Sequence, residues 1–100
     1  MKVNLSGHHI EITDSLRTFV EEKMSKVDRH YDNIISGQVT LTVIKERMTA
    51  EVTLSIGGGE LHASAESTDM YVAIDQMVDK LIRQVQKHKE KLVARQQGQI

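Results

Sequence analysis

The five histidines are the side chains of this chain that could exchange a proton near neutral pH or ligate a metal. His8 and His9 are adjacent, so on an extended strand they point to opposite faces, which makes a poor chelate. His62 lies two residues from Ser64, and a serine–histidine–acid arrangement with Glu66 can be drawn there. Such an arrangement also needs an oxyanion hole and a group that orients the histidine, and no pattern supplies either. We therefore expect neither a catalytic residue nor a metal site.

Other kinds of reactive site are equally poorly supported. The chain has no cysteine, which excludes disulfides, thiolate metal sites and cysteine nucleophiles. The glycines at 57–59 lie between two predicted strands and lack the Gly-Lys-Ser/Thr of a phosphate loop, so they predict a turn. We expect no cofactor and no enzymatic activity.

The basic residues near the C-terminal end suggest a different chemistry. The formal net charge is −1, yet residues 1–79 hold 7 basic and 13 acidic residues, a net charge of −6. Residues 80–100 hold 6 basic residues against Glu90 alone, a net charge of +5. This asymmetry favours a polyanionic partner such as RNA. The alternative is a solvated helix whose cations complement its dipole, although the dipole acts mainly over the last turn.

On a helix these basic residues would gather on one side. At about 100° per residue, Lys87 and Lys91 fall within about 20° of Lys80 around the helix axis. Arg83, Gln84 and Arg95 fall within about 60° of it. We call this set the basic ridge, and its members are Lys80, Arg83, Gln84, Lys87, Lys91 and Arg95.

Further cations lie outside the basic ridge. Lys89 falls on the other flank of the same helix, and an earlier helix carries Lys26 and Arg29 toward solvent with Lys23 at the edge of its apolar face. If the two helices lie side by side, these groups could frame one basic groove. Such a groove would hold phosphates through charge and shape, without base readout.

The elements that must position these groups follow the order β-α-β-β-β-α. Alternation of polar and apolar residues predicts strands over 2–6, 38–44, 49–56 and 61–65. Thr13 is a plausible cap for a helix that reaches about Tyr31, and residues 67–69 can cap a second helix that reaches about Arg95. We expect a single domain over residues 1–95 and a flexible tail at 96–100.

Each predicted strand has one apolar face, which indicates an α+β fold. Both helices should pack on the same side of a four-stranded mixed sheet, with a parallel first pair and antiparallel hairpins after it. The opposite face would be polar and carries no aromatic residue, which disfavours base stacking on the sheet. Its members are Asn4, Ser6, Thr40, Thr42, Thr53, Ser55, His62 and Ser64.

Several linked segments resemble the ribosome hibernation promoting factor family in its short bacterial form. They are Ile-Glu-Ile-Thr at 10–13, Gly-Gly-Glu-Leu-His-Ala-Ser-Ala at 58–65, Asp-Met-Tyr-Val-Ala-Ile-Asp at 69–75, Lys-Leu-Ile-Arg-Gln at 80–84 and Lys-His-Lys-Glu-Lys at 87–91. The resemblance runs in order over about residues 1–95.

The resemblance implies a fold similar to double-stranded-RNA-binding domains and a place on the small ribosomal subunit. There the protein would occupy the mRNA and tRNA channel, block translation and promote inactive ribosome dimers in stationary phase. The implied partners are the small subunit with its rRNA and, functionally, ribosome modulation factor. The RNA-binding residues that the resemblance implies are Lys80, Arg83, Lys87 and Lys91, and less directly Lys89, Lys23, Lys26 and Arg29.

The subtype rests on the end of the chain. Long-form members carry a second, dimerising domain that this chain is too short to include, and the ribosome-associated inhibitor paralogue has an acidic extension that residues 94–100 lack. The sequence therefore favours the dimer-promoting form. With no apolar segment near the ~20 residues of a membrane span and no signal-peptide stretch, we expect a cytoplasmic protein, monomeric when free. A general double-stranded-RNA-binding module and a protein-interaction module using the polar sheet face stay open as alternatives.

Overall fold

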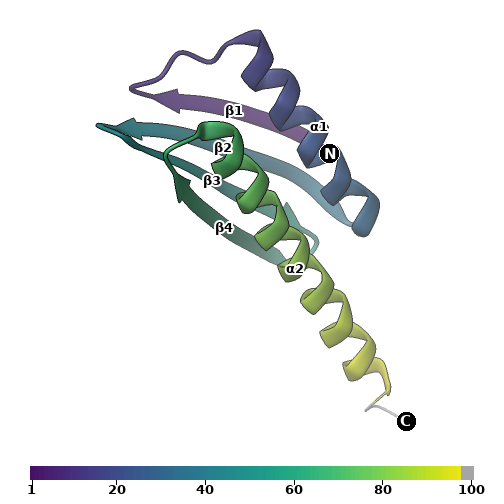
Figure 1. Ribbon diagram of the computed structural model, residues 1–100. Helices are drawn as coiled ribbons and strands as arrows, with labels where there is room; N and C mark the ends of the chain where they lie inside the picture. Colours follow the sequence, from purple (N-terminus) through teal and green to yellow (C-terminus); the bar gives the residue numbers. More distant parts are fainter. Residues whose placement is uncertain (98–100) are drawn as a thin grey trace.

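The chain forms six elements in the predicted order (Figure 1). They are β1 (Lys2–His8), α1 (Asp14–His30), β2 (Ile34–Ile44), β3 (Arg47–Ile56), β4 (Gly59–Ser67) and α2 (Met70–Gln97). The computed structural model describes the backbone of residues 1–97 and the side chains of residues 1–90. Of the tail predicted over 96–100, residues 98–100 lie outside the described residues, while residues 96 and 97 continue α2.

The four strands form one mixed sheet in the order β1-β2-β3-β4. β1 and β2 are parallel, and the other two pairs are antiparallel, as predicted. The strands are longer than the segments of alternating polar and apolar residues. Backbone hydrogen bonds between strands do not depend on side-chain polarity, so they also include residues that break the alternation. In β2 the register shifts between Ile34 and Ser36, which leaves Ile35 unpaired and 62% exposed.

Local capping fixes where both helices begin. The Thr13 hydroxyl accepts a hydrogen bond from the Leu16 amide at 3.2 Å, which satisfies one free donor of the first turn of α1. The Asp69 carboxylate accepts from the Tyr71 amide at 2.9 Å and caps α2 in the same way. At 1.5 Å per residue α2 is about 42 Å long. Its C-terminal part consequently projects past the end of the sheet (Figure 1).

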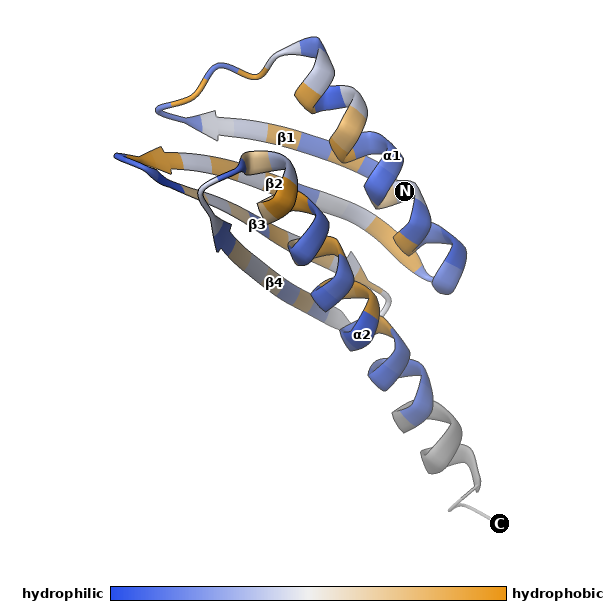
Figure 2. Ribbon diagram, in the orientation of Figure 1, coloured by the Kyte–Doolittle hydropathy of each residue, from blue (hydrophilic) through white to orange (hydrophobic). Residues whose placement is uncertain are grey.

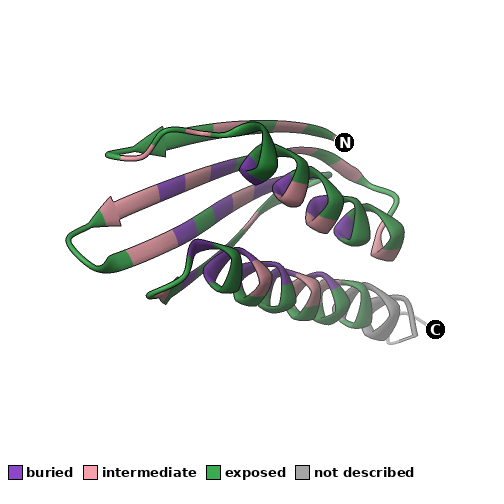
Figure 3. Cartoon of the chain, turned by 45° about the horizontal axis from the view of Figure 1, so that its top comes forward, coloured by how far each residue is buried: buried purple, intermediate pink, exposed green. Residues whose placement is uncertain are grey.

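Both helices cover the same face of the sheet, and the core lies between these two layers (Figure 3). The buried positions of the strands and helices are apolar, and Figure 2 shows hydrophobic and hydrophilic residues interspersed along both kinds of element. No polar or charged residue is buried among those that the structure describes. The largest fully buried side chains are Met24, Leu41, Leu54, Ile74, Met77 and Leu81.

The two helices run parallel to each other, and they contact each other near both ends of α1. Near their N-terminal ends the Phe19 and Tyr71 rings pack edge to face, with centroids 5.0 Å apart. Near the C-terminal end of α1, the Tyr31 and His88 rings pack in the same way at 5.6 Å. The positive dipole ends of α1 and α2 therefore lie at one end of the helical layer, and the cations of α2 lie toward the other.

Candidate nucleic-acid interface

Lys80 and Gln84 reach from α2 to the free edge of the sheet. The Lys80 ammonium donates a hydrogen bond to the Ser64 carbonyl of β4 at 2.9 Å, and the Gln84 amide donates to the His62 carbonyl. β4 is an edge strand, so these carbonyls face outward and need partners. Both side chains thus hold α2 against β4 and cover that edge, and Lys80 keeps further N–H donors for an anion.

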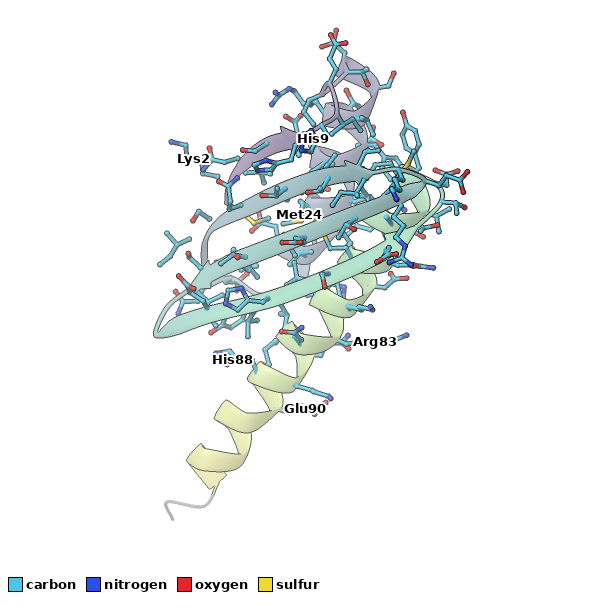
Figure 4. The ribbon with its side chains drawn as sticks, turned by 90° about the vertical axis from the view of Figure 1, so that its left-hand side faces the viewer. Lys2, His9, Met24, Arg83, His88 and Glu90 are labelled. Carbon is cyan, nitrogen blue, oxygen red and sulfur yellow. The ribbon has the colours of Figure 1, made fainter. Side chains whose placement is uncertain are left out.

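Arg83 and Lys87 form the outward part of the basic ridge. Both are exposed, and neither makes an ion pair or a side-chain hydrogen bond within the described residues. Figure 4 shows Arg83 pointing away from α2 on the side opposite to His88. Two extended cations with uncommitted donors, one turn apart on a rigid helix, are suited to bind phosphates.

Lys89 of α2 and Lys23 of α1 each have a partner on the other helix. The Lys89 ammonium donates to the His30 carbonyl at 2.7 Å, which satisfies an acceptor at the C-terminal end of α1. The Lys23 ammonium lies 2.7 Å from the Asp75 carboxylate. This hydrogen bond raises the pKa of Lys23 above its ordinary value, against the opposing effect of partial burial. Both lysines join the helices.

The expectation of one groove framed by the cations of both helices does not hold. Lys80 and Gln84 contact β4, so they lie on the flank of α2 that faces away from α1, and Lys87 lies within about 20° of Lys80. The space between the helices instead holds the Lys23–Asp75 ion pair and the two aromatic contacts. The 3.6-residue period predicts the angular order of side chains around each helix, but it does not predict which flank faces the neighbouring helix.

Four other cations complete the set. Lys26 and Arg29 are exposed on the C-terminal half of α1, as predicted, and make no ion pair within residues 1–90. The side chains of Lys91 and Arg95 lie outside the described residues, although the backbone there is helical. The structure therefore separates two basic surfaces. We call Lys80, Arg83 and Lys87 the β4-side surface, and Lys26 and Arg29 the α1 surface.

His62 lies on the open sheet face with partners other than those first considered. Its Nδ1 is 3.1 Å from the Thr53 hydroxyl, and its Nε2 is 3.6 Å from the Glu60 carboxylate. Neither Ser64 nor Glu66 contacts the ring with a polar atom among the described side chains. Within those residues no group of three or more His, Asp or Glu side chains could hold a metal ion.

His88 is a feature that the sequence analysis did not single out. It follows Leu81 and Val85 on the core-facing stripe of α2, and its Nε2 is buried without a hydrogen-bond partner in the described part of the chain. Its ring packs on Tyr31 where α2 leaves the sheet. The position at the end of an apolar helical stripe was the signal that could have identified it.

No described helix has the combination of length and apolar character that crossing a membrane requires.

Comparison with known proteins gives consistent matches over nearly the whole chain. The family described as "Sigma 54 modulation protein / S30EA ribosomal protein" matches residues 3–93. A ribosome hibernation promoting factor of Azotobacter vinelandii is 54% identical over 99 residues, covering 99% of this chain and 92% of the relative. The ribosome hibernation promoting factor of Escherichia coli K12 is 49% identical over 92 residues, covering 92% of this chain and 97% of the relative.

Solved structures give the same result for the fold. The N-terminal domain of Thermus thermophilus Protein Y superposes with a TM-score of 0.83 at 35% identity, covering 88% of this chain and 99% of that one. A ribosomal subunit interface protein from Coxiella burnetii gives a TM-score of 0.85 at 27% identity, covering 90% and 99%. The similarity to double-stranded-RNA-binding domains stays a prediction.

Proposed function

Because this chain belongs to the ribosome hibernation promoting factor family, we propose that it acts in ribosome hibernation by binding the small ribosomal subunit. Relatives with that name share about half of their aligned residues with this chain. One structural neighbour is described as a ribosomal subunit interface protein. In this proposal the protein acts by binding the ribosome and not by catalysing a reaction.

The β4-side surface supplies the proposed RNA contacts. Arg83 and Lys87 are one turn apart, about 6 Å along the axis of α2, so they can contact neighbouring phosphates of one strand. Lys80 adds a third charge on the same side while it holds β4. Lys89, Lys91 and the α1 surface extend the interface in the proposal.

The observation that carries this proposal is the position of the charge. The whole chain has a net charge of −1, so it has no general attraction for RNA. The exposed cations of α2 instead concentrate positive charge along one flank of a helix that projects beyond the sheet (Figure 1). Such a surface binds backbone phosphates and leaves selection of the site to shape, because the open sheet face offers no Phe, Tyr or Trp ring for base stacking.

We further propose a steric mechanism. An elongated domain of 54 × 22 × 18 Å, held in the channel of the small subunit by its α2 cations, would exclude mRNA and tRNA from the same space. Inactive ribosome dimers, promoted together with ribosome modulation factor in stationary phase, are the expected outcome in the cytoplasm. The free protein is proposed to be a monomer.

Co-sedimentation with purified small subunits tests the binding step. Association at low salt that weakens as salt rises is expected, since each neutralised phosphate releases counterions. Absence of association at low salt would overturn the proposal. Equal affinity for a plain RNA duplex would instead favour a general double-stranded-RNA-binding module. A sucrose-gradient ribosome profile with and without the protein then tests dimer promotion.

A further inference from the structure

A shallow pocket lies between the N-terminal turns of the two helices, on the outer surface of the helical layer. It is lined by Asp14, Ser15, Thr18, Phe19 and Glu22 of α1 and by Tyr71 of α2. The basic ridge begins more than two turns farther along α2, so this pocket is a separate surface. The proposed function does not use it.

Two aromatic rings are among the groups that line this pocket. Phe19 and Tyr71 pack edge to face with an interplanar angle of 79°, which fixes both rings. Tyr71 remains 41% exposed, and the adjacent Val72 is 42% exposed. The Lys23 ammonium already lies 5.3 Å from the centroid of the Phe19 ring, so one of the two rings has a cation within interaction distance. The exposed part of the Tyr71 ring is open to a second cation from outside the chain.

The rim of the pocket is acidic. Asp14 and Glu22 are exposed, and neither makes an ion pair within the described residues. No basic residue lines the pocket, and the nearby Lys23 is paired with Asp75. The N-terminal dipole of α1 offsets part of the charge of Asp14, which lies in the first turn, but neither carboxylate has an ion-pair partner among the described residues. Two such carboxylates beside aromatic rings disfavour a phosphate and attract a cation.

We propose that this pocket binds an arginine side chain presented by a cationic polypeptide segment. A guanidinium is planar, so it can stack on the exposed face of Tyr71 while its N–H groups donate to the carboxylates of Asp14 and Glu22. A lysine ammonium would gain the charge attraction but not the stacking or the forked hydrogen bonds. The protein thereby has two docking surfaces of opposite charge, a basic one toward RNA and an acidic aromatic one toward protein.

The test titrates the ¹⁵N-labelled full chain with a short capped peptide containing two arginines, followed by amide chemical shifts. No ribosome or RNA is present, so failure here leaves the proposed ribosome binding untouched, and the reverse also holds. Shifts should concentrate at residues 14–22 and 71–72. The same peptide with lysines should bind roughly threefold or more weakly, because the stacking contribution is lost.

Variants separate the aromatic from the acidic contribution. Tyr71→Phe should retain binding, whereas Tyr71→Leu keeps apolar packing on Phe19 but removes the ring and should lower affinity roughly threefold. The pair Asp14→Asn with Glu22→Gln should lower affinity roughly threefold to tenfold. The spectrum of each variant also reports whether the fold is retained.

A matched charge control uses Glu46→Gln with Glu51→Gln, which removes the same charge away from the pocket. This control should change affinity less than twofold. Three results would each overturn the proposal: shifts spread evenly over all acidic surfaces, unchanged affinity in Tyr71→Leu, or an oligouridylate shifting the pocket resonances in place of the peptide.

Discussion

Replacing Arg83 and Lys87 by glutamine should weaken binding to small subunits without lowering stability. Both side chains are exposed and have no partner within the described residues, so the folded domain loses no internal contact. Exposed substitutions away from caps and packed positions usually change the free energy of unfolding by less than about 0.5 kcal/mol. Glutamine is unbranched and has a helix propensity similar to those of arginine and lysine, so the substitutions remove the charge without weakening the helix.

The magnitude follows from the number of phosphate contacts removed. Each contact contributes about 0.7 to the slope of log affinity against log salt for a single strand and about 0.9 for a duplex. Loss of two contacts should therefore reduce the slope by roughly 1.4–1.8. At low salt the affinity should fall by roughly 1–3 kcal/mol, or about 5-fold to 150-fold, the range expected for charged hydrogen bonds at exposed sites.

The assay is co-sedimentation with small subunits at a series of salt concentrations, with thermal denaturation as the check on folding. The control pair is Lys2→Gln with Lys45→Gln, which makes the same charge change on β1 and on the β2–β3 hairpin. If only net charge mattered, both pairs would weaken binding equally. An unchanged salt slope in the Arg83/Lys87 variant, or an equal loss in the control, would refute the assignment of the β4-side surface.

Three further predictions concern the framework. Leu81→Ala removes a fully buried side chain between α2 and the sheet and should cost roughly 2–5 kcal/mol in chemical denaturation. Gly7→Ala would place a Cβ 2.7 Å from the Ile10 carbonyl oxygen, so a loss of roughly 1–3 kcal/mol is expected by the same measurement. Because Asp75 raises the pKa of Lys23, their ion pair stabilises the fold below pH 10.5 and is lost as pH rises through the raised pKa. The difference in Tm between the native chain and Asp75→Asn should accordingly shrink above pH 10.5, and a constant difference would contradict this role.

The polar groups of α2 divide into two kinds by their contacts. Lys80, Gln84 and Lys89 donate to backbone carbonyls of β4 and of the end of α1, so they position the helix as well as contribute polar surface. Arg83 and Lys87 have no such partner among the described residues. If all five residues were substituted together, a loss of binding could come from lost RNA contacts or from a displaced helix. The first variant is therefore confined to Arg83 and Lys87.

The sequence by itself determined the order and kind of the elements. Alternation in the strands, 3.6-residue periodicity in the helices and the capping residues Thr13 and Asp69 are local signals, because each depends on groups a few residues apart. The parallel first pair and the shared face for both helices followed from the same patterns. The resemblance to the family was also contained in short segments of the chain and was confirmed by the comparisons.

The tertiary structure alone decided what each helix flank contacts. Angular arithmetic placed Lys80, Gln84 and Lys87 on one side of α2, but the flank that meets α1 depends on how both helices sit on the twisted sheet. Contacts between residues far apart in sequence, such as Lys23 with Asp75 and Lys80 with Ser64, set that orientation. Such pairings depend on the relative placement of whole elements, and local sequence patterns carry no signal for them.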